Sequence, residues 1–105
     1  MQVKEVTEVT DDLVEALGRL MFQLSQSAVP PTRETIQQMV DAEAIRLLVA
    51  IDDGSILGTL TLALFPIPTG VRAWIEDVVV DQAVRGEGVG EALNRKALDL
   101  AKESG

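Results

Sequence analysis

Six consecutive residues near the end of the chain, Arg85-Gly86-Glu87-Gly88-Val89-Gly90, have the composition of an anion-binding loop. They stand between a β-branched run, Val78-Val79-Val80, and a segment with helical apolar spacing. Free N–H groups at the start of a helix point outward, and glycines allow an anion to approach them closely. Arg85 can add charge-assisted hydrogen bonds to phosphate. The segment therefore predicts a binding site for a diphosphate. The main chain of the preceding strand could pair with the part of the ligand that extends from the diphosphate.

Two common nucleotide-binding motifs do not fit this loop. A dinucleotide fingerprint, G-x-G-x-x-G, needs glycine at its sixth position, where this sequence has Glu91. A Walker A loop needs Gly-Lys followed by Ser or Thr, and no such triplet follows the glycines. The same glycines could also serve only to make a tight turn from strand to helix, an alternative that the sequence leaves open.

The composition excludes several classes of chemistry. The 105 residues contain neither Cys nor His, which excludes disulfides, Ser-His and Cys-His catalysis and the usual zinc sites within this chain, and we expect no metal. A net charge of −8 argues against a nucleic-acid partner and fits cationic small molecules or basic peptides, or only solubility. The N-terminus has no apolar signal core and no apolar run reaches membrane-spanning length, so we expect a cytoplasmic protein without membrane contact.

The first half of the chain predicts one strand and two helices. Residues 3–9 alternate imperfectly and indicate a short strand. Thr10 precedes two acidic residues, the pattern of a helix start, and an apolar stripe follows at helical spacing: Leu13, Leu17, Leu20, Met21 and Leu24. Pro30-Pro31 ends this helix, and Thr32 predicts the cap of a second, shorter helix with an apolar side formed by Ile36, Met39 and Val40.

The second half predicts three strands and a helix. Residues 45–51 are nearly all apolar, as in a strand covered on both faces, and Asp52-Asp53-Gly54-Ser55 predicts a turn. Residues 56–65 alternate, with Leu60, Leu62 and Leu64 on one side, and after a loop at 66–70 a strand follows at 71–80. A loop at 81–88 leads to a helix with one apolar face: Val89, Leu93, Ala97, Leu100 and Ala101. The predicted order is β-α-α-β-β-β-α in a single α/β (α+β) domain, 1–105.

These features together resemble the GNAT superfamily of N-acetyltransferases. The pattern R-x-x-G-x-G, here residues 85–90, is similar to the family's acetyl-coenzyme A motif. Residues 75–80 are similar to its fourth strand and residues 91–104 to its third helix, and the order of elements matches as well. The resemblance covers essentially the whole chain. It implies a mixed, mostly antiparallel sheet with helices on both faces.

The resemblance also implies acetyl-coenzyme A as cosubstrate and assigns residues to it. Arg85 and four backbone amides would bind the diphosphate, those of Gly86, Gly88, Val89 and Gly90. The main chain of Val78 and Val80 would pair with the pantetheine and orient the acetyl carbonyl, which requires no particular side chain.

The implied reaction is attack of a primary amine of a small molecule or peptide on the acetyl thioester, after the amine has lost a proton. Glu76 is the first candidate for the base, because it lies two residues before Val78 and alternation places both on one face. By the same alternation Asp77 points to the other face and is the second candidate. Glu76 could equally be a solvated edge residue, and Trp74, on its face, either lines an acceptor pocket or packs.

The sequence departs from the family's pattern at its end. GNAT domains continue past the third helix with a fifth strand and a further helix, so the resemblance implies that residues 1–105 are a C-terminally incomplete domain. That later helix often supplies a Tyr that protonates the leaving thiolate, and this sequence has no Tyr. We expect the uncovered strand at 71–80 to promote self-association, as in a homodimer. The alternative to an enzyme is a non-catalytic module that binds acetyl-coenzyme A or serves in assembly.

Overall fold

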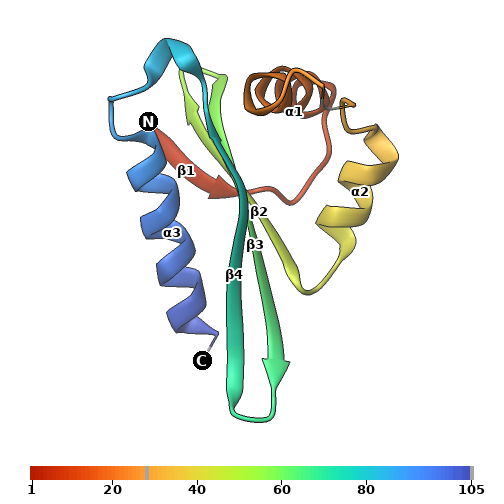
Figure 1. Cartoon of the computed structure of the whole chain (residues 1–105), viewed down its shortest axis with the longest axis vertical. Coiled ribbons are helices and arrows are strands. Elements are labelled where there is room, and N and C mark those ends of the chain that lie inside the picture. Colours follow the sequence, from red (N-terminus) through yellow and green to blue (C-terminus); the bar gives the residue numbers. More distant parts are fainter. Residues whose placement is uncertain (28, 105) are drawn as a thin grey trace.

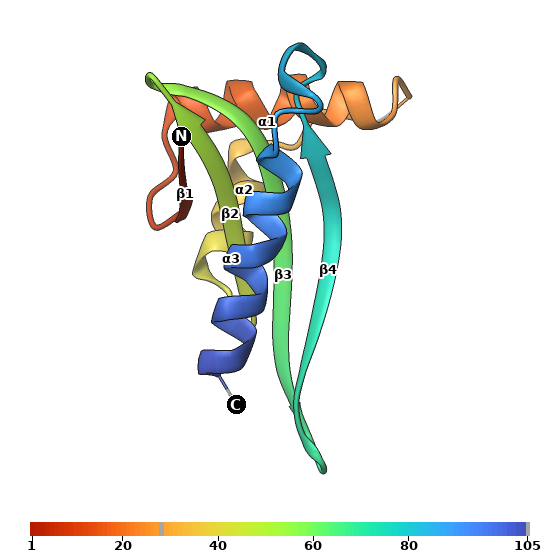
Figure 2. The same cartoon turned by 90° about the vertical axis from the view of Figure 1, so that its left-hand side faces the viewer.

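A computed structural model describes residues 1–27 and 29–104, and Ala28 and the final Gly105 lie outside the described residues. Four strands form one sheet in the order β1-β2-β3-β4, and every neighbouring pair is antiparallel. Helices α1 and α2 lie on one face of the sheet and α3 lies on the other (Figures 1 and 2). The elements are β1 (Gln2–Glu5), α1 (Asp11–Leu24), α2 (Arg33–Asp41), β2 (Ile45–Asp52), β3 (Ser55–Ile67), β4 (Gly70–Val80), a 3₁₀ turn η1 (Gln82–Val84) and α3 (Val89–Glu103). The predicted fold class and element order are confirmed.

Both predicted helix caps are present. The side chain of Thr10 accepts a hydrogen bond from the Leu13 amide, and that of Thr32 accepts one from the Thr35 amide, each at 3.1 Å. Each bond satisfies one of the amides that a helix start leaves without an intrahelical partner. The first strand is shorter than predicted, because the chain leaves the sheet after Glu5 to reach α1 on one face.

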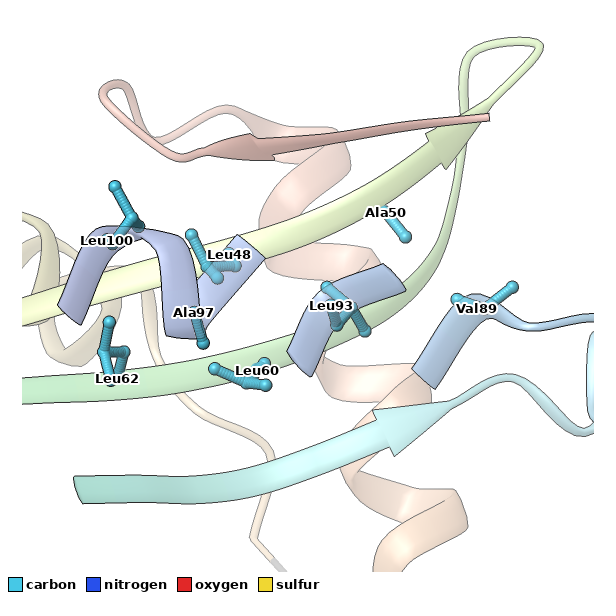
Figure 3. Close-up of a cluster of buried hydrophobic side chains, with 8 residues drawn as sticks. All are labelled: Leu48, Ala50, Leu60, Leu62, Val89, Leu93, Ala97 and Leu100. Carbon is cyan, nitrogen blue, oxygen red and sulfur yellow. The ribbon is translucent and has the colours of Figure 1, made fainter. Parts of the chain in front are cut away.

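Alternation along the strands produces two separate apolar cores. On the α3 face, side chains of β2 and β3 pack against the buried stripe of α3, as Figure 3 shows: Leu48, Ala50, Leu60, Leu62, Val89, Leu93, Ala97 and Leu100. On the opposite face, Leu47 and Val49 pack against Leu13, Leu17 and Ile36 of α1 and α2. Strand β2 is therefore covered on both faces, as its unbroken apolar run predicted.

The two hairpin turns differ in how well the sequence located them. Asp53 and Gly54 both have positive φ, 53° and 80°, which is the two-residue turn expected from their types. The loop predicted at 66–70 is wrong in extent, since Pro66 pairs with Val71 and Ile67 with Gly70. Proline is tolerated near a strand end, where its missing N–H is not needed. The β3–β4 hairpin consequently projects past the end of α3 (Figure 1).

Gly58 in β3 determines how closely α3 approaches the sheet. A Cβ atom at this position would lie 3.0 Å from the Val79 carbonyl oxygen and 3.2 Å from side-chain atoms of Val89 and Leu93. Only a residue without a side chain leaves this space for α3. The start of α3 is thereby held beside the end of β4, where Gly90 in turn leaves room for Val80.

Within residues 1–27 and 29–104, every helix is too short or too polar to pass through a lipid bilayer. The same residues contain no group of three or more Asp and Glu side chains arranged to hold a metal ion.

Candidate functional site

Strand β4 presents one edge of its main chain outside the sheet, because in the described residues it pairs with β3 alone. The Asp81 amide donates to the Leu57 carbonyl of β3 at 2.8 Å. In a trans peptide the carbonyl of Val80 must then point the opposite way, toward the open edge. In agreement, the Val80 carbonyl accepts a hydrogen bond from Arg85 Nε at 3.3 Å. The main chain at the end of β4 is thus accessible on the open edge.

The loop after β4 is shaped by two glycines in the left-handed region. Gly86 has φ 87° and Gly88 has φ 86°, and a Cβ atom at either would meet no atom within 4 Å. Glycine is therefore needed here for its backbone conformation and not for space. Gly88 is the N-cap of α3 and supplies no side chain to its amides.

Several amides of this loop have no internal acceptor. The amides of Val84, Glu87 and Ala92 donate to carbonyls of the same loop. Five other amides donate to no backbone or side-chain acceptor among the described residues, those of Gly86, Gly88, Val89, Gly90 and Glu91. The first four are those that the sequence predicts to bind an anion. The helix dipole adds partial positive charge at the same place.

The loop and the open edge of β4 border one groove, which we call the α3 groove, with a volume of about 570 Å³. All seven residues predicted for the cosubstrate line it: Val78, Val80, Arg85, Gly86, Gly88, Val89 and Gly90. The structure therefore brings the predicted residues together. The opposite wall is Gln23 and Leu24 at the end of α1, which sequence reasoning missed.

Asp81 connects this loop to α1. Its carboxylate accepts hydrogen bonds from the Arg19 guanidinium, from Gln23 Nε2 at 3.5 Å and from the Ala83 amide at 3.0 Å. The Ala83 amide is the main cause that holds the pKa of Asp81 below its usual value; partial burial opposes it, and Gln23 and Arg19 act with it. Gln23 Oε1 also accepts from the Gln82 amide at 2.9 Å, so both ends of the Gln23 amide group fix the loop.

A β-bulge interrupts β4 beside the groove. Thr59 pairs with Val79 and Thr61 with Glu76, so two residues of β4, Asp77 and Val78, lie opposite the single residue between the threonines. Asp77 adopts φ 50°, a region that Asp tolerates better than most residues.

The bulge overturns the prediction that Glu76 shares a face with Val78. Directly paired residues share a face, so Glu76, opposite Thr61, lies on the face of α1 and α2. Val79, opposite Thr59, is on that face too, and Val78 beside it falls on the other. Asp77 lines a pocket together with both threonines, so it lies on the face of Glu76 and not opposite to it. Strict alternation was wrong because the bulge adds one residue.

Trp74 and Glu76 interact with each other on the exposed part of β4. The Trp74 indole N–H donates to Glu76 Oε1 at 2.7 Å. Trp74 is 55% exposed, so it is not a core residue, and it does not contribute to the walls of the pocket that Asp77 lines.

That pocket, which we call the α1–α2 pocket, has a volume of about 320 Å³ and lies between the two helices and strands β2 to β4. Asp77 is the charged residue among those that line it, and the others are apolar residues and threonines. Leu24 lines both the α1–α2 pocket and the α3 groove, while Asp77 and Val78 are neighbours that line one each. The two cavities therefore lie on either side of the β4 bulge and share Leu24.

Comparisons with known proteins agree with this architecture. A family model described as "Acetyltransferase (GNAT) family" matches residues 10–105. Comparison with curated proteins gives no match.

Three solved structures illustrate the similarity. A protein of Agrobacterium tumefaciens strain C58 has a TM-score of 0.88 at 24% identity, over 99% of this chain and 75% of that chain. An acetyltransferase of Trypanosoma brucei has a TM-score of 0.81 at 25% identity, over 99% and 76% of the two chains. An aminoglycoside 6'-N-acetyltransferase complexed with coenzyme A has a TM-score of 0.81 at 14% identity, over 99% and 57%. The likenesses below 25% identity indicate a common fold.

Proposed function

The chain belongs to the GNAT acetyltransferase family, and on that premise we propose that it transfers the acetyl group of acetyl-coenzyme A to a primary amine. The observation that carries the proposal is the set of five amides without an internal acceptor, between Gly86 and Glu91, whose residues line the α3 groove. The coenzyme A complex of the similar aminoglycoside 6'-N-acetyltransferase supports the choice of cosubstrate.

The residues of the groove fit the diphosphate of coenzyme A. A diphosphate needs several donors within a short distance and no side chain in front of them, and Gly86 and Gly88 supply that opening. Arg85 lies beside them, with Nε on the Val80 carbonyl, and its remaining donors would bind phosphate oxygens. The open main chain of Val78 and Val80 would then hold the pantetheine as an added strand and orient the acetyl carbonyl.

The proposed reaction forms a C–N bond and breaks the C–S bond of the thioester. The amine attacks as the free base, the bonding electrons leave with sulfur, and the products are an amide and coenzyme A. One proton must leave the ammonium group first. We propose Glu76 for this step, because its carboxylate lies on the face of the α1–α2 pocket and the Trp74 indole fixes one of its oxygens.

Two measurements test the proposal. Coenzyme A is expected to raise the melting temperature of the protein, because it binds the folded state alone. Acetyl-coenzyme A with a panel of primary amines is expected to release free thiol. A rise in melting temperature without thiol release from any amine indicates a binding module instead of an enzyme. Absence of both contradicts the proposed cosubstrate.

A further inference from the structure

We propose that the α1–α2 pocket receives the acceptor and that Asp77 binds its ammonium group, which selects amines carried on an apolar chain or ring. The inference rests on the proposed function and extends it to the class of acceptor. A polyhydroxylated or polycationic amine is a poor match for this pocket, for reasons that follow from its walls.

The walls of the pocket are mainly apolar. Leu17 of α1, Ile36 of α2 and Leu47 of β2 are almost fully buried, so their side chains form a fixed surface. Met21 and Met39 complete the walls and are partly exposed. Methionine adapts its shape easily, which suits a surface that accepts apolar bodies of more than one form.

Most of the polar groups in the walls are already satisfied. The Thr59 hydroxyl donates to the Leu48 carbonyl at 3.0 Å, and the Thr35 hydroxyl accepts a bond from Thr32 at 3.1 Å. The remaining polar side chains in the walls are those of Thr61, which is partly buried, and Asp77, which is exposed to solvent. One carboxylate and one hydroxyl suit a single ammonium group, whereas further hydroxyls or charges on the acceptor would lose their water without finding partners.

The β-bulge places this carboxylate at the boundary with the α3 groove. A bulge changes the direction of a side chain relative to regular strand alternation, and Asp77 with φ 50° is its left-handed residue. The next residue, Val78, already lines the α3 groove. An ammonium group held by Asp77 would therefore sit where the acetyl group is expected to arrive, with the apolar body directed away from the coenzyme.

The test is titration calorimetry on the protein saturated with coenzyme A, using hexylamine, hexan-1-ol and spermidine as probes. Hexylamine is expected to bind, and hexan-1-ol, which has the same chain without charge, to bind about tenfold more weakly. In Asp77→Asn, which keeps the shape and the left-handed tolerance of the residue, hexylamine affinity is expected to fall about ten- to hundredfold. Coenzyme A affinity should stay unchanged. Steady-state assays should show a rise in KM for hexylamine by a similar factor.

The chain offers a matched control in Asp53→Asn. Asp53 is also an aspartate with positive φ, 53°, but it lies in the β2–β3 turn and does not line the pocket. This variant should bind hexylamine as the wild type does. If Asp77→Asn fails to fold, Thr61→Val is the second variant and should weaken hexylamine binding about fivefold.

The outcomes separate this inference from the proposed function. Thiol release with spermidine while hexylamine neither binds nor reacts would overturn the inference and leave the acetyltransferase intact. Unchanged hexylamine affinity in Asp77→Asn would overturn it as well. Failure to release thiol with any amine, together with no response to coenzyme A, would instead overturn the proposed function.

Discussion

Asp81, the first residue after β4, accepts a hydrogen bond from the guanidinium of Arg19 in α1, 62 residues earlier in the chain. The same guanidinium donates to the Ile56 carbonyl at the start of β3 at 3.1 Å. One side chain thus joins the first helix, the central hairpin and the loop after β4. This contact holds the end of α1, with Gln23 and Leu24, as a wall of the α3 groove.

Replacing Asp81 by Asn should lower the free energy of unfolding at neutral pH but not in acid. The folded-state pKa of Asp81 lies below the usual value of 3.8, so its contribution is complete above that value and is lost as pH falls through the lowered pKa. We expect Asp81→Asn to lower the free energy of unfolding by about 1 kcal/mol at neutral pH. Urea denaturation should show the difference from wild type shrinking below about pH 4. Asp99→Asn, on the exposed side of α3, is the control, and a difference that stays constant into acid contradicts the assignment.

Gly88→Ala should weaken coenzyme A binding as well as destabilise the protein. A non-glycine residue at φ 86° costs about 1 kcal/mol, and relaxing that strain would move the amides at the start of α3. Gly54→Ala is matched, since Gly54 has φ 80° and equally open surroundings but lies in the β2–β3 turn. Both variants should lose similar stability in thermal denaturation, and Gly88→Ala alone should lose coenzyme A affinity in calorimetry. Equal affinities in the two variants would refute the role of these amides.

Arg85→Ala should reduce coenzyme A affinity about tenfold, because charge-assisted hydrogen bonds to phosphate are lost. The affinity that remains should depend less steeply on salt concentration, since one charge no longer contributes. Arg72→Ala is the control, because it removes the same charge at the other end of β4, far from the loop. It should leave the coenzyme A affinity and its salt dependence unchanged. A salt dependence that is the same in wild type and Arg85→Ala would count against phosphate contact.

Gly58→Ala should destabilise the protein by about 1–3 kcal/mol, because its methyl group overlaps the space of Val89, Leu93 and the Val79 carbonyl. Relief of this crowding requires α3 to move away from β3. Since α3 carries the amides of the groove, coenzyme A affinity should fall together with the denaturation midpoint. If Gly58→Ala kept both its coenzyme A affinity and its denaturation midpoint, α3 would have to accommodate the methyl group without loss of stability.

Glu76→Gln should lower kcat roughly 100-fold, because the variant cannot accept a proton. Coenzyme A affinity should not change. Trp74→Phe removes the hydrogen bond to Glu76 without removing the carboxylate, so it should reduce kcat far less. An unaltered kcat in Glu76→Gln would show that another group accepts the proton, with Asp77 the next to test.

Features that depend on a few neighbouring residues were predictable from the sequence. Thr10 and Thr32 cap helices because a hydroxyl there meets amides three residues ahead, and the apolar stripe of α3 follows from helical spacing alone. The conformation of the glycine-containing loop before α3 belongs to this group, since its glycines and the following helix are contiguous.

Features that depend on pairing across the sheet were not predictable. Glu76-Asp77-Val78 contains no glycine to signal a bulge, and its only local hint is the tolerance of Asp for positive φ. The Arg19–Asp81 contact and the closeness of Gly58 to α3 arise from residues that are far apart in sequence. Self-association through β4 stays a prediction, to be checked by sedimentation; Trp74 and Val78 are among the exposed side chains of that strand.

The α3 groove and the α1–α2 pocket share Leu24 and otherwise have separate sets of lining residues. Under the proposed function, donor and acceptor would therefore contact different side chains except near this shared residue. Met21 and Met39 line only the α1–α2 pocket and are partly exposed, so they are the positions where a library could change amine preference with the least disturbance of the core and of the coenzyme A site.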